Sequence, residues 1–331
     1  MPAYPSNGGA GHDQALHEVT ALLARARDAV IACHIHPDAD TLGSGLALAA
    51  FLRSRGTRVS VSFAEPSALP EVFATLPGSG DIMRPSDVPA AVDTFISVDA
   101  ASSDRLGELA GYVGTAAHSI VIDHHRSNAG FGDVNYIDAT ADSTTVLVAR
   151  ILRQFGEAPF PRDIAHCLYA GLVTDTGSFR WCGPEAHVLA AELIGCGIDA
   201  VAISRDLLDT HPFGRLGMLS TVLGGARLLP EVAGGQGLVL ATVHEADLLG
   251  LPEDERETVI DIVRGTAEAE VAAVLKETGP ARWAVSLRSK QCVDVARVAA
   301  AFGGGGHARS AGFNATGDQE AVIADLVREL G

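Results

Sequence analysis

The sequence predicts an α/β protein: a mainly parallel sheet domain joined by a helical linker to a second, smaller α/β domain. Short apolar segments at residues 30–33, 94–98 and 119–122 have the length and branched residues of buried strands. Segments with apolar residues at helical spacing alternate with these strands. Such alternation is typical of βαβ units, which form parallel sheets covered by helices. The strand pattern restarts beyond residue 233, after a largely helical segment.

The first domain is expected to contain a helix at residues 14–28, followed by the strand at 30–33. A polar turn then leads into a helix that ends near Leu52. Further strands are expected at residues 58–63, 94–98 and 119–122, and further helices at 143–155, at 161–174 and after Glu185.

The chain has 331 residues, for which two domains are the default expectation. We expect a flexible tail at residues 1–13, a first domain at 14–199, a helical linker at 200–232 and a second domain at 233–331. In the second domain, strands are expected at 238–243, 271–275 and 283–287, and helices at 255–264 and 294–302.

The composition excludes several classes of protein. Hydrophobic residues make up 47% of the chain, enough to bury substantial cores, and no apolar run is long enough to cross a membrane. The tail has neither the basic nor the apolar region of a signal peptide. Five cysteines without a C-x-x-C pair argue against a disulfide framework and fit a reducing cytoplasm.

The net charge of −17 bears on the partners of this protein. A protein that holds a long duplex or single strand by its phosphates needs a basic track, and the acidic excess disfavours one. A small local basic pocket is still compatible with this charge. We therefore expect any phosphate-containing substrate to be short.

Acidic and imidazole side chains follow three of the expected strands. The segment His34–Asp40 follows the first strand, Asp99 follows the strand at 94–98, and Asp123-His124-His125 follows the strand at 119–122. Ligands of open α/β sheets bind outside the carboxyl ends of the strands, so these side chains are expected to converge on one cleft. The alternative for the first segment is a polar loop that caps the next helix, with Asp40 or Thr41 as the N-cap.

These residue types favour a metal site. The candidate ligands are mainly oxygens, with two imidazoles and no thiolate: His34, Asp38, Asp40, Asp99, His124 and Asp175. Such a set suits manganese or magnesium, with cobalt as a further option, and four carboxylates balance two divalent cations. Asp99, alone at its strand end, is the natural bridging ligand. Two metals ~3.5–4 Å apart that share a water would generate a hydroxide nucleophile and clamp a phosphoryl oxygen.

The adjacent residues Asp123, His124 and His125 are expected to have different roles. Neighbouring side chains diverge, so one histidine can bind metal while the other faces a substrate phosphate. Asp123 would then orient a ligand through a hydrogen bond.

A second signal is Gly303–Gly306 followed by His307. Four consecutive glycines allow close approach of the backbone, with N–H groups turned towards an anion. Arg288, Lys290 and Arg309 could add positive charge to the same pocket. The alternative is a flexible loop with solvated basic residues, and a P-loop is excluded because no G-K-[ST] follows.

At these residues the sequence resembles the DHH phosphoesterase superfamily. Its four motifs are matched in order by His34-x-x-x-Asp38-x-Asp40, Val98-Asp99, Asp123-His124-His125 and residues 171–177. The glycine segment with His307, followed by Ala311-Gly312, matches the companion substrate-binding domain. The resemblance covers nearly the whole chain after the tail and is greatest to the bacterial nanoRNase/pAp phosphatase group.

This resemblance implies a manganese-dependent enzyme that is commonly a homodimer. It implies one metal held by His34, Asp38 and Asp99. It implies a second metal held by Asp40, Asp99, His124 and Asp175. His125 would touch the scissile phosphate. The expected catalytic residues are His125, Asp123 and Asp99. The expected substrate-binding residues, at the far end of the nucleotide, are Arg288, Gly304, Gly305, Gly306, His307 and Arg309.

We therefore expect a two-metal phosphoesterase that uses a metal-bridging hydroxide. Its expected substrates are short oligoribonucleotides such as nanoRNA and pApA, together with pAp and cyclic di-AMP, all hydrolysed to mononucleotides. One alternative is a family II-like inorganic pyrophosphatase, against which the glycine segment argues. Another is a nucleotide-sensing module without catalysis. An exonuclease for long strands is disfavoured by the net charge.

Overall fold

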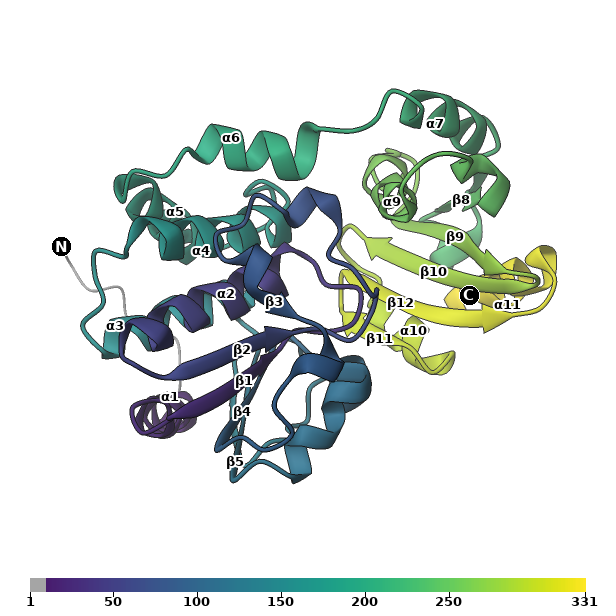
Figure 1. Cartoon of the computed structure of the whole chain (residues 1–331). Helices are drawn as coiled ribbons and strands as arrows, with labels where there is room; N and C mark the ends of the chain where they lie inside the picture. The colour runs from purple at the N-terminus through teal and green to yellow at the C-terminus, as the bar shows by residue number, and fades with distance from the viewer. Residues whose placement is uncertain (1–9) are drawn as a thin grey trace. The chain divides into compact units, whose positions relative to one another are not determined.

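The computed structural model describes residues 10–331, except for the side chains of residues 10, 253 and 254. The chain forms two compact units that divide between Thr210 and His211 (Figure 1). Of the predicted tail, residues 1–9 lie outside the described part, and residues 10–13 belong to the first helix.

The first unit is built on a parallel sheet of six strands, which confirms the predicted α/β class. The strand order is β3-β2-β1-β4-β5-β6, and every neighbouring pair is parallel. The strands are β1 (Asp28–Ala32), β2 (Arg58–Ser62), β3 (Ile82–Met83), β4 (Thr94–Val98), β5 (His118–Asp123) and β6 (Val134–Ile137). Strands β3 and β6 were not predicted, because segments of two and four residues are too short to show a clear alternation.

Helices cover both faces of this sheet. The α-helices are α1 (Ala10–Leu23), α2 (Ala39–Ser54), α3 (Thr144–Gln154), α4 (Arg162–Asp175), α5 (Pro184–Gly195) and α6 (Ala200–Ser204), the last continued by a π-helical turn, η5 (Arg205–Asp209). Residues from α1 to α5 share one hydrophobic core with one face of the sheet. The other face packs against the 3₁₀ segment η4 (Ser103–Gly114) through Leu106 and Leu109. The remaining short 3₁₀ turns are η1 (Glu71–Phe73), η2 (Ser79–Asp81) and η3 (Pro85–Asp87).

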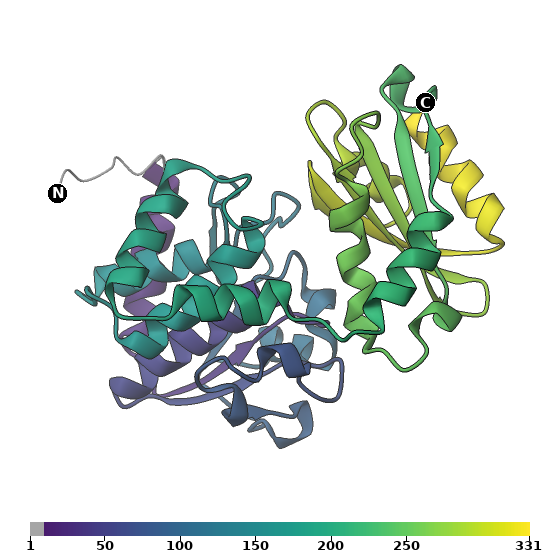
Figure 2. The same ribbon diagram turned by 90° about the horizontal axis from the view of Figure 1, so that it is seen from above.

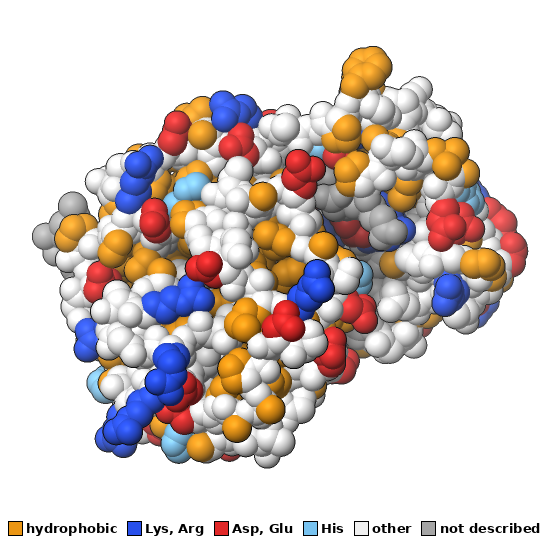
Figure 3. Space-filling model, viewed as in Figure 1, with side chains coloured by type: hydrophobic (Ala, Val, Ile, Leu, Met, Phe, Trp, Pro, Cys, Tyr) orange, Lys and Arg blue, Asp and Glu red, His pale blue; other side chains and the backbone are white. Residues whose placement is uncertain are grey.

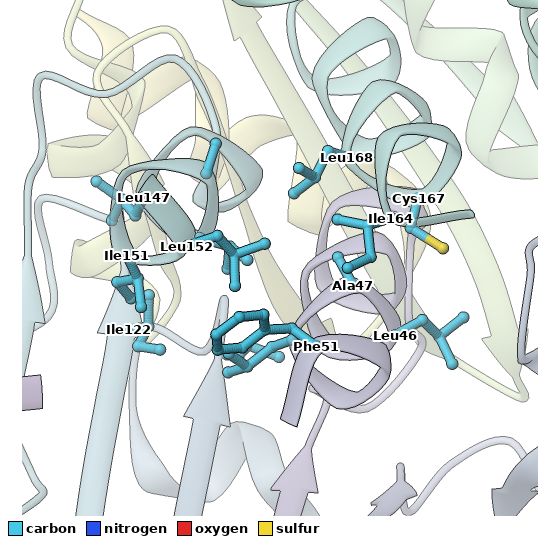
Figure 4. Close-up of a cluster of buried hydrophobic side chains, with 14 of the residues drawn as sticks. Leu46, Ala47, Phe51, Ile122, Leu147, Ile151, Leu152, Ile164, Cys167 and Leu168 are labelled. Carbon is cyan, nitrogen blue, oxygen red and sulfur yellow. The ribbon is translucent and has the colours of Figure 1, made fainter. Parts of the chain in front are cut away.

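The core between α2, α3 and α4 brings the first and last thirds of this unit together. Figure 4 shows Phe51 extending from α2 towards Leu152 of α3 and Ile122 of β5, with Ile164 and Leu168 of α4 beside α2. Helices α2 and α4 approach closely because residue 43 has no side chain. A Cβ atom at Gly43 would lie 2.3 Å from the carbonyl oxygen of Cys167.

The first helix is shorter than predicted. Helix α1 ends at Leu23, where the apolar periodicity ends, and Asp28 already belongs to β1. Strand β1 ends at Ala32, but the backbone N–H of Cys33 still donates to the carbonyl oxygen of Ser62. Boundaries of this kind depend on hydrogen bonds to distant strands, which local pattern does not report.

The second unit contains a mixed sheet of six strands in the order β11-β12-β10-β9-β8-β7. Strands β8 and β9 are parallel, and the other neighbouring strands in this order are antiparallel. The strands are β7 (Arg227–Leu229), β8 (Leu238–Val243), β9 (Val271–Gly279), β10 (Arg282–Ser289), β11 (Gly305–His307) and β12 (Ser310–Thr316). The glycine segment therefore contributes a short strand, which the sequence analysis did not predict.

Helices also cover this second sheet. They are α7 (Arg215–Gly224), α8 (Val232–Gly235), α9 (Val259–Val263), α10 (Val295–Ala301) and α11 (Gln319–Leu330), with 3₁₀ turns η6 (Glu245–Leu248) and η7 (Glu253–Thr258). Helices α10 and α11 share one core with the sheet, and α7 and α9 share another. Figure 2 shows the yellow helix α11 and the green helices on opposite faces of the sheet. Within the described residues, no helix has the length and apolar character needed to span a membrane.

The segment predicted as a linker, residues 200–232, is divided between the two units. Helix α6 packs against α4 in the first unit. Helix α7 and strand β7 pack against β8 in the second unit.

Candidate metal centre

The strand order brings the predicted motif residues to one edge of the first sheet. Strands β1 and β4 are neighbours, and the chain proceeds outward from them in opposite directions. The carboxyl ends of β1, β4 and β5 lie at the same edge because the strands are parallel. An order reversal of this kind opens a crevice outside the carboxyl ends, where ligands of α/β sheets bind.

One group of side chains forms around His34, which follows β1. Its Nε2 atom lies 3.6 Å from Asp38 Oδ2 and 3.5 Å from Asp99 Oδ2. The three residues each offer a ligand atom, and these atoms lie within 4.8 Å of one another. This spacing is compatible with a single cation.

A second group forms around His124, which follows β5. Its Nε2 atom lies 3.2 Å from Asp175 Oδ2, at the end of α4, and 4.0 Å from Asp40 Oδ2, in the first turn of α2. The ligand atoms of these three residues also lie within 4.8 Å of one another. Residues 135 positions apart in the chain (175 − 40) therefore meet at one point.

Asp99 lies between the two groups. Its Oδ1 atom is 3.5 Å from Nε2 of His124, and its Oδ2 atom is 3.5 Å from Nε2 of His34. Each oxygen of one carboxylate thus faces a different group. The backbone of Asp99 is left-handed, with φ of 59°, a conformation that few non-glycine residues adopt and that is found at functional sites.

The two central imidazoles are held in the form that binds metal through Nε2. His34 Nδ1 lies 2.8 Å from the carbonyl oxygen of Ile35, and His124 Nδ1 lies 3.2 Å from that of Ala141. A carbonyl oxygen only accepts, so each Nδ1 carries a proton, and each Nε2 would supply its lone pair to a cation bound among the carboxylates. Metal-binding histidines are oriented in this way by hydrogen bonds from the other ring nitrogen.

Asp123 orients His125 rather than His124. Its Oδ1 atom accepts a hydrogen bond of 2.7 Å from His125 Nδ1, and its Oδ2 atom accepts one of 2.7 Å from Asn128 Nδ2. Although burial favours the neutral ring, this bond to Asp123 and the nearby charge of Asp99 raise the pKa of His125. Asp123 and Asp99 thus favour the charged, proton-donating form of His125.

The alternative of a helix-capping loop is partly correct, with a different residue as the cap. Asp38, and neither Asp40 nor Thr41, is the N-cap of α2, because its Oδ1 atom accepts from the backbone N–H groups of Asp40 and Thr41, each at 3.0 Å. Its Oδ2 atom faces His34. Capping and cation binding therefore use different oxygens of the same carboxylate.

Two threonines at the start of α3 complete the centre, and the sequence analysis missed them. The N–H groups of Thr144 and Thr145 donate to Asp40 at 2.6 and 3.0 Å, and Thr144 Oγ1 donates to Asp99 Oδ1 at 2.9 Å. A helix N-terminus stabilises negative charge. The sequence indicated a helix start at Ser143, but nothing local connected it with Asp40, which lies 104 positions earlier in the chain.

Gly171 allows α4 to pass next to Asp40. A Cβ atom at this position would lie 2.7 Å from Asp40 Oδ1 and 2.6 Å from Thr145 Cγ2. Real Cβ atoms do not approach other atoms so closely, so a side chain would displace Asp40 or the start of α3. This glycine belongs to the motif at residues 171–177, and its role is steric.

The charge balance of the centre favours divalent cations. Asp40 and Asp99 are 1% and 3% exposed. Burial, together with the charges of Asp99 and Asp38, raises the pKa of the Asp40 carboxyl well above its ordinary value. Burial favours the neutral ring of His34, but the nearby carboxylates, Asp38 more than Asp99, raise the pKa of His34 to about 10. Carboxylates with imidazoles and no thiolate suit manganese, magnesium or cobalt, so the residues of this centre fit the expected divalent cations.

The predicted substrate-binding residues lie in the second unit. Arg288 of β10 pairs with Ser310 of β12, which pairs in turn with His307 of β11. The glycines have a structural reason: a Cβ atom at Gly304 would lie 2.2 Å from the carbonyl oxygen of Gly312, and one at Gly306 would lie 2.5 Å from that of Ser310. Gly305 has no such neighbour within 4 Å, and Arg309 is exposed.

A parallel sheet that gathers carboxylates and imidazoles at the carboxyl ends of its strands suits the class of metal-dependent hydrolases. The chain belongs to the DHH family. The model of the DHH family N-terminal domain matches residues 28–172, and the model of the DHHA1 domain matches residues 240–330.

Individual relatives agree with this assignment. The chain is 30% identical over 311 residues to the bifunctional oligoribonuclease and PAP phosphatase NrnA of Thermus thermophilus, covering 90% of each chain. It is 24% identical to the cyclic-di-AMP phosphodiesterase GdpP of Geobacillus thermodenitrificans, covering 89% of this chain and 46% of that protein. The crystal structure of an exopolyphosphatase-related protein from Bacteroides fragilis matches with a TM-score of 0.85 and 26% identity, covering 96% of each chain.

Proposed function

We propose that this protein is a two-metal phosphoesterase that hydrolyses short oligoribonucleotides such as nanoRNA and pApA, pAp and cyclic di-AMP to mononucleotides. The observation that carries the proposal is the position of Asp99, whose two oxygens face two separate groups of potential metal ligands. An arrangement with one shared carboxylate suits two divalent cations, and we propose manganese for both.

The choice of substrates is supported by the relatives. The name of the Thermus thermophilus relative gives oligoribonuclease and PAP phosphatase activities, and that of the Geobacillus thermodenitrificans relative gives cyclic-di-AMP hydrolysis. All these substrates are short and carry phosphates. The net charge of −17 supports the same selection, because it disfavours the long basic track that an extended strand requires.

We assign the first group, His34, Asp38 and Asp99, to one cation. The second group, Asp40, His124 and Asp175, holds the other cation and shares Asp99 with the first. When bound, such cations act as Lewis acids on a phosphoryl oxygen and acidify a water molecule. Thr144 and Thr145 hold the carboxylates of Asp99 and Asp40 in place through the hydrogen bonds described above.

His125 is assigned to the scissile phosphate. Its Nδ1 atom is bonded to Asp123, so we assign its Nε2 atom to a phosphate oxygen. Asp123, held by Asn128, keeps the ring in this orientation. The raised pKa of His125 favours the protonated ring, which donates a charge-assisted hydrogen bond to the anion.

In the second unit, Arg288, Gly304, Gly305, Gly306, His307 and Arg309 are assigned to the nucleotide portion remote from the reaction. The row formed by Arg288, Ser310 and His307 supports this assignment, because it presents a cation and an imidazole at one end of the sheet. We further propose that the protein is a homodimer, which sedimentation analysis checks directly.

The test is hydrolysis by the purified protein with manganese. We expect AMP release from pApA, pAp and cyclic di-AMP, and no degradation of a long 5′-labelled RNA. Asp99→Asn should lower kcat at least about 10³-fold, because the shared ligand is lost. Asp87→Asn, at an exposed position of η3, serves as the matched control and should leave kcat unchanged. A folded wild-type protein that releases no AMP from any of the three substrates would refute the proposal, and phosphate release from pyrophosphate instead would favour the pyrophosphatase alternative.

A further inference from the structure

A hollow lined by arginines lies at the edge of the first sheet opposite the candidate metal centre. Its volume is about 870 Å³, and it is lined by residues 23–27, which follow α1, and residues 54–58, which follow α2. These two segments lead into the amino ends of β1 and β2. Because the candidate metal centre lies at the carboxyl ends of the same strands, the hollow is separate from it.

Four arginines line this hollow: Arg25, Arg27, Arg55 and Arg58. Arg58 pairs with Asp28, and the Arg55 guanidinium lies 5.6 and 5.2 Å from the ring centroids of Phe51 and Phe155. Within the described part of the chain, the guanidinium groups of Arg25 and Arg27 make no hydrogen bond or ion pair, although the backbone N–H of Arg27 donates to Asp93 Oδ2 at 2.9 Å. Figure 3 shows basic side chains, all of them arginines in this unit, gathered at the lower left, over α1 and the beginnings of β1 and β2.

The ends of the two helices do not account for all four arginines. The backbone N–H groups of Arg25 and Arg55 donate to Leu22 and Leu52, so these terminal carbonyl oxygens already have partners. The helix dipole favours a cation directly after each helix, which explains one arginine in each segment. It does not explain Arg27, which directly precedes β1, or Arg58, which opens β2.

The concentration of positive charge is unusual for this chain. Acidic residues outnumber basic ones by 41 to 24, yet the hollow gathers four arginines, and among the described residues only the Arg58 guanidinium has an acidic partner, Asp28. Like charges that share a concave surface repel each other, and an anion in the hollow removes that repulsion. The planar guanidinium matches phosphate oxygens in a bidentate arrangement.

We propose that this arginine hollow binds a compact polyanion with clustered phosphates, at a site separate from the candidate metal centre. Its volume falls within the range of roughly 300–1,000 Å³ that is typical of small-molecule sites. A ligand with two or more adjacent phosphates fits best, because several arginines face the same space. The bound anion is a ligand of the protein and not its substrate. The proposal does not depend on the catalytic assignment.

The test is isothermal titration calorimetry of the metal-free full-length protein with inorganic tripolyphosphate. We expect the wild type to bind, and we expect Arg25→Ser/Arg27→Ser to bind at least about tenfold more weakly. Arg162→Ser/Arg328→Ser removes the same charge from two exposed positions elsewhere and should leave the affinity unchanged. Arg25→Lys/Arg27→Lys keeps the charges without the bidentate geometry and should show an intermediate affinity.

A second arm replaces tripolyphosphate with ATP. Tighter binding of ATP than of tripolyphosphate would indicate a nucleotide ligand, and equal binding would indicate that the phosphates alone are recognised. Hydrolysis of pApA with manganese should be the same in wild type and in Arg25→Ser/Arg27→Ser, which separates this site from the catalytic one. Absence of binding to the wild type, or equal affinity of the wild type and Arg25→Ser/Arg27→Ser, would overturn the proposal.

Discussion

At the scale of single residues, hydrogen-bond donors hold particular carboxylates in place in both units. In the first unit, Asp40 and Asp99 receive hydrogen bonds from the start of α3. In the second unit, Glu270 Oε1 accepts from the backbone N–H groups of Gln291 and Cys292, each at 2.6 Å, and from Ser289 Oγ at 3.1 Å. Glu270 therefore fixes the loop between β10 and α10, which precedes the glycine segment.

The charge of Glu270 makes the stability of the second unit dependent on pH. Although desolvation opposes it, the backbone N–H groups of the loop lower the pKa of Glu270 below its ordinary value of 4.5. A lowered pKa in the folded state means that ionised Glu270 stabilises the protein above the pKa of the unfolded state. This stabilisation is lost as the pH falls through the folded-state pKa.

We expect Glu270→Gln to lower the free energy of unfolding by about 2 kcal/mol at neutral pH, because an ionised acceptor of several hydrogen bonds is lost. The difference from wild type should shrink as the pH falls below about 4. Urea denaturation between about pH 3 and about pH 7, a range that spans the ordinary pKa of a glutamate, measures this difference. Glu268→Gln, two positions away and exposed, is the control and should match wild type throughout. A difference that is constant over this range would contradict the electrostatic explanation.

At the scale of elements, the start of α3 links the two groups of candidate metal ligands. Ser143 caps this helix through a bond from the N–H of Val146, and its hydroxyl also bonds that of Thr145. The helix N-terminus then directs Thr144 towards both Asp40 and Asp99. Removal of the Thr144 hydroxyl should therefore change the position of the Asp99 carboxylate, which lies between the two groups.

We expect Thr144→Val to weaken metal binding roughly 10–100-fold, because Asp99 loses the hydroxyl that holds Oδ1. Thr144→Ser keeps the hydroxyl and should retain an affinity close to that of wild type. Calorimetric titration with manganese, with hydrolysis of pApA as a second readout, distinguishes the two variants. Equal affinities for Thr144→Val and Thr144→Ser would show that the hydroxyl does not position Asp99.

Several strands of the first sheet could be predicted from the sequence. Strand β4 was predicted at its observed bounds, and β1, β2 and β5 within two residues, because buried strands of this kind have a dense apolar pattern. Strand β11 was missed because a glycine segment has no side-chain alternation. Its existence depends on pairing with β12, in which Gly304 and Gly306 permit the close approach.

At the scale of the whole molecule, the six side chains assigned above as metal ligands all belong to the first unit. A cation that binds only the folded form stabilises it by mass action, by about 2.7 kcal/mol at a concentration of 100 times Kd. Burial and the charges of Asp99 and Asp38 raise the pKa of Asp40. A bound cation would offset both effects, which adds to the difference between the metal-bound and metal-free forms.

We expect chelation of divalent cations to lower the melting temperature of the first unit by roughly 5–10 °C, given about 2–4 °C per kcal/mol for a unit of this size. The transition of the second unit should not move. Differential scanning calorimetry with manganese and with a chelator measures both transitions. Asp99→Asn should show little response to chelation, and an equal response in this variant would place the metal elsewhere.

By itself, the sequence determined the α/β class, the strands that end in acidic or imidazole residues, and the ligand types that suit divalent cations. These features depend on residues close together in the chain, where periodicity and motif spacing are directly visible. The tertiary structure decided which side chains meet. The two-sided position of Asp99, the bonds from Thr144 and Thr145, the steric role of Gly171 and the arginine hollow all depend on packing between distant segments. Such contacts leave no local pattern, because the periodicity within a segment does not report which distant segment it packs against.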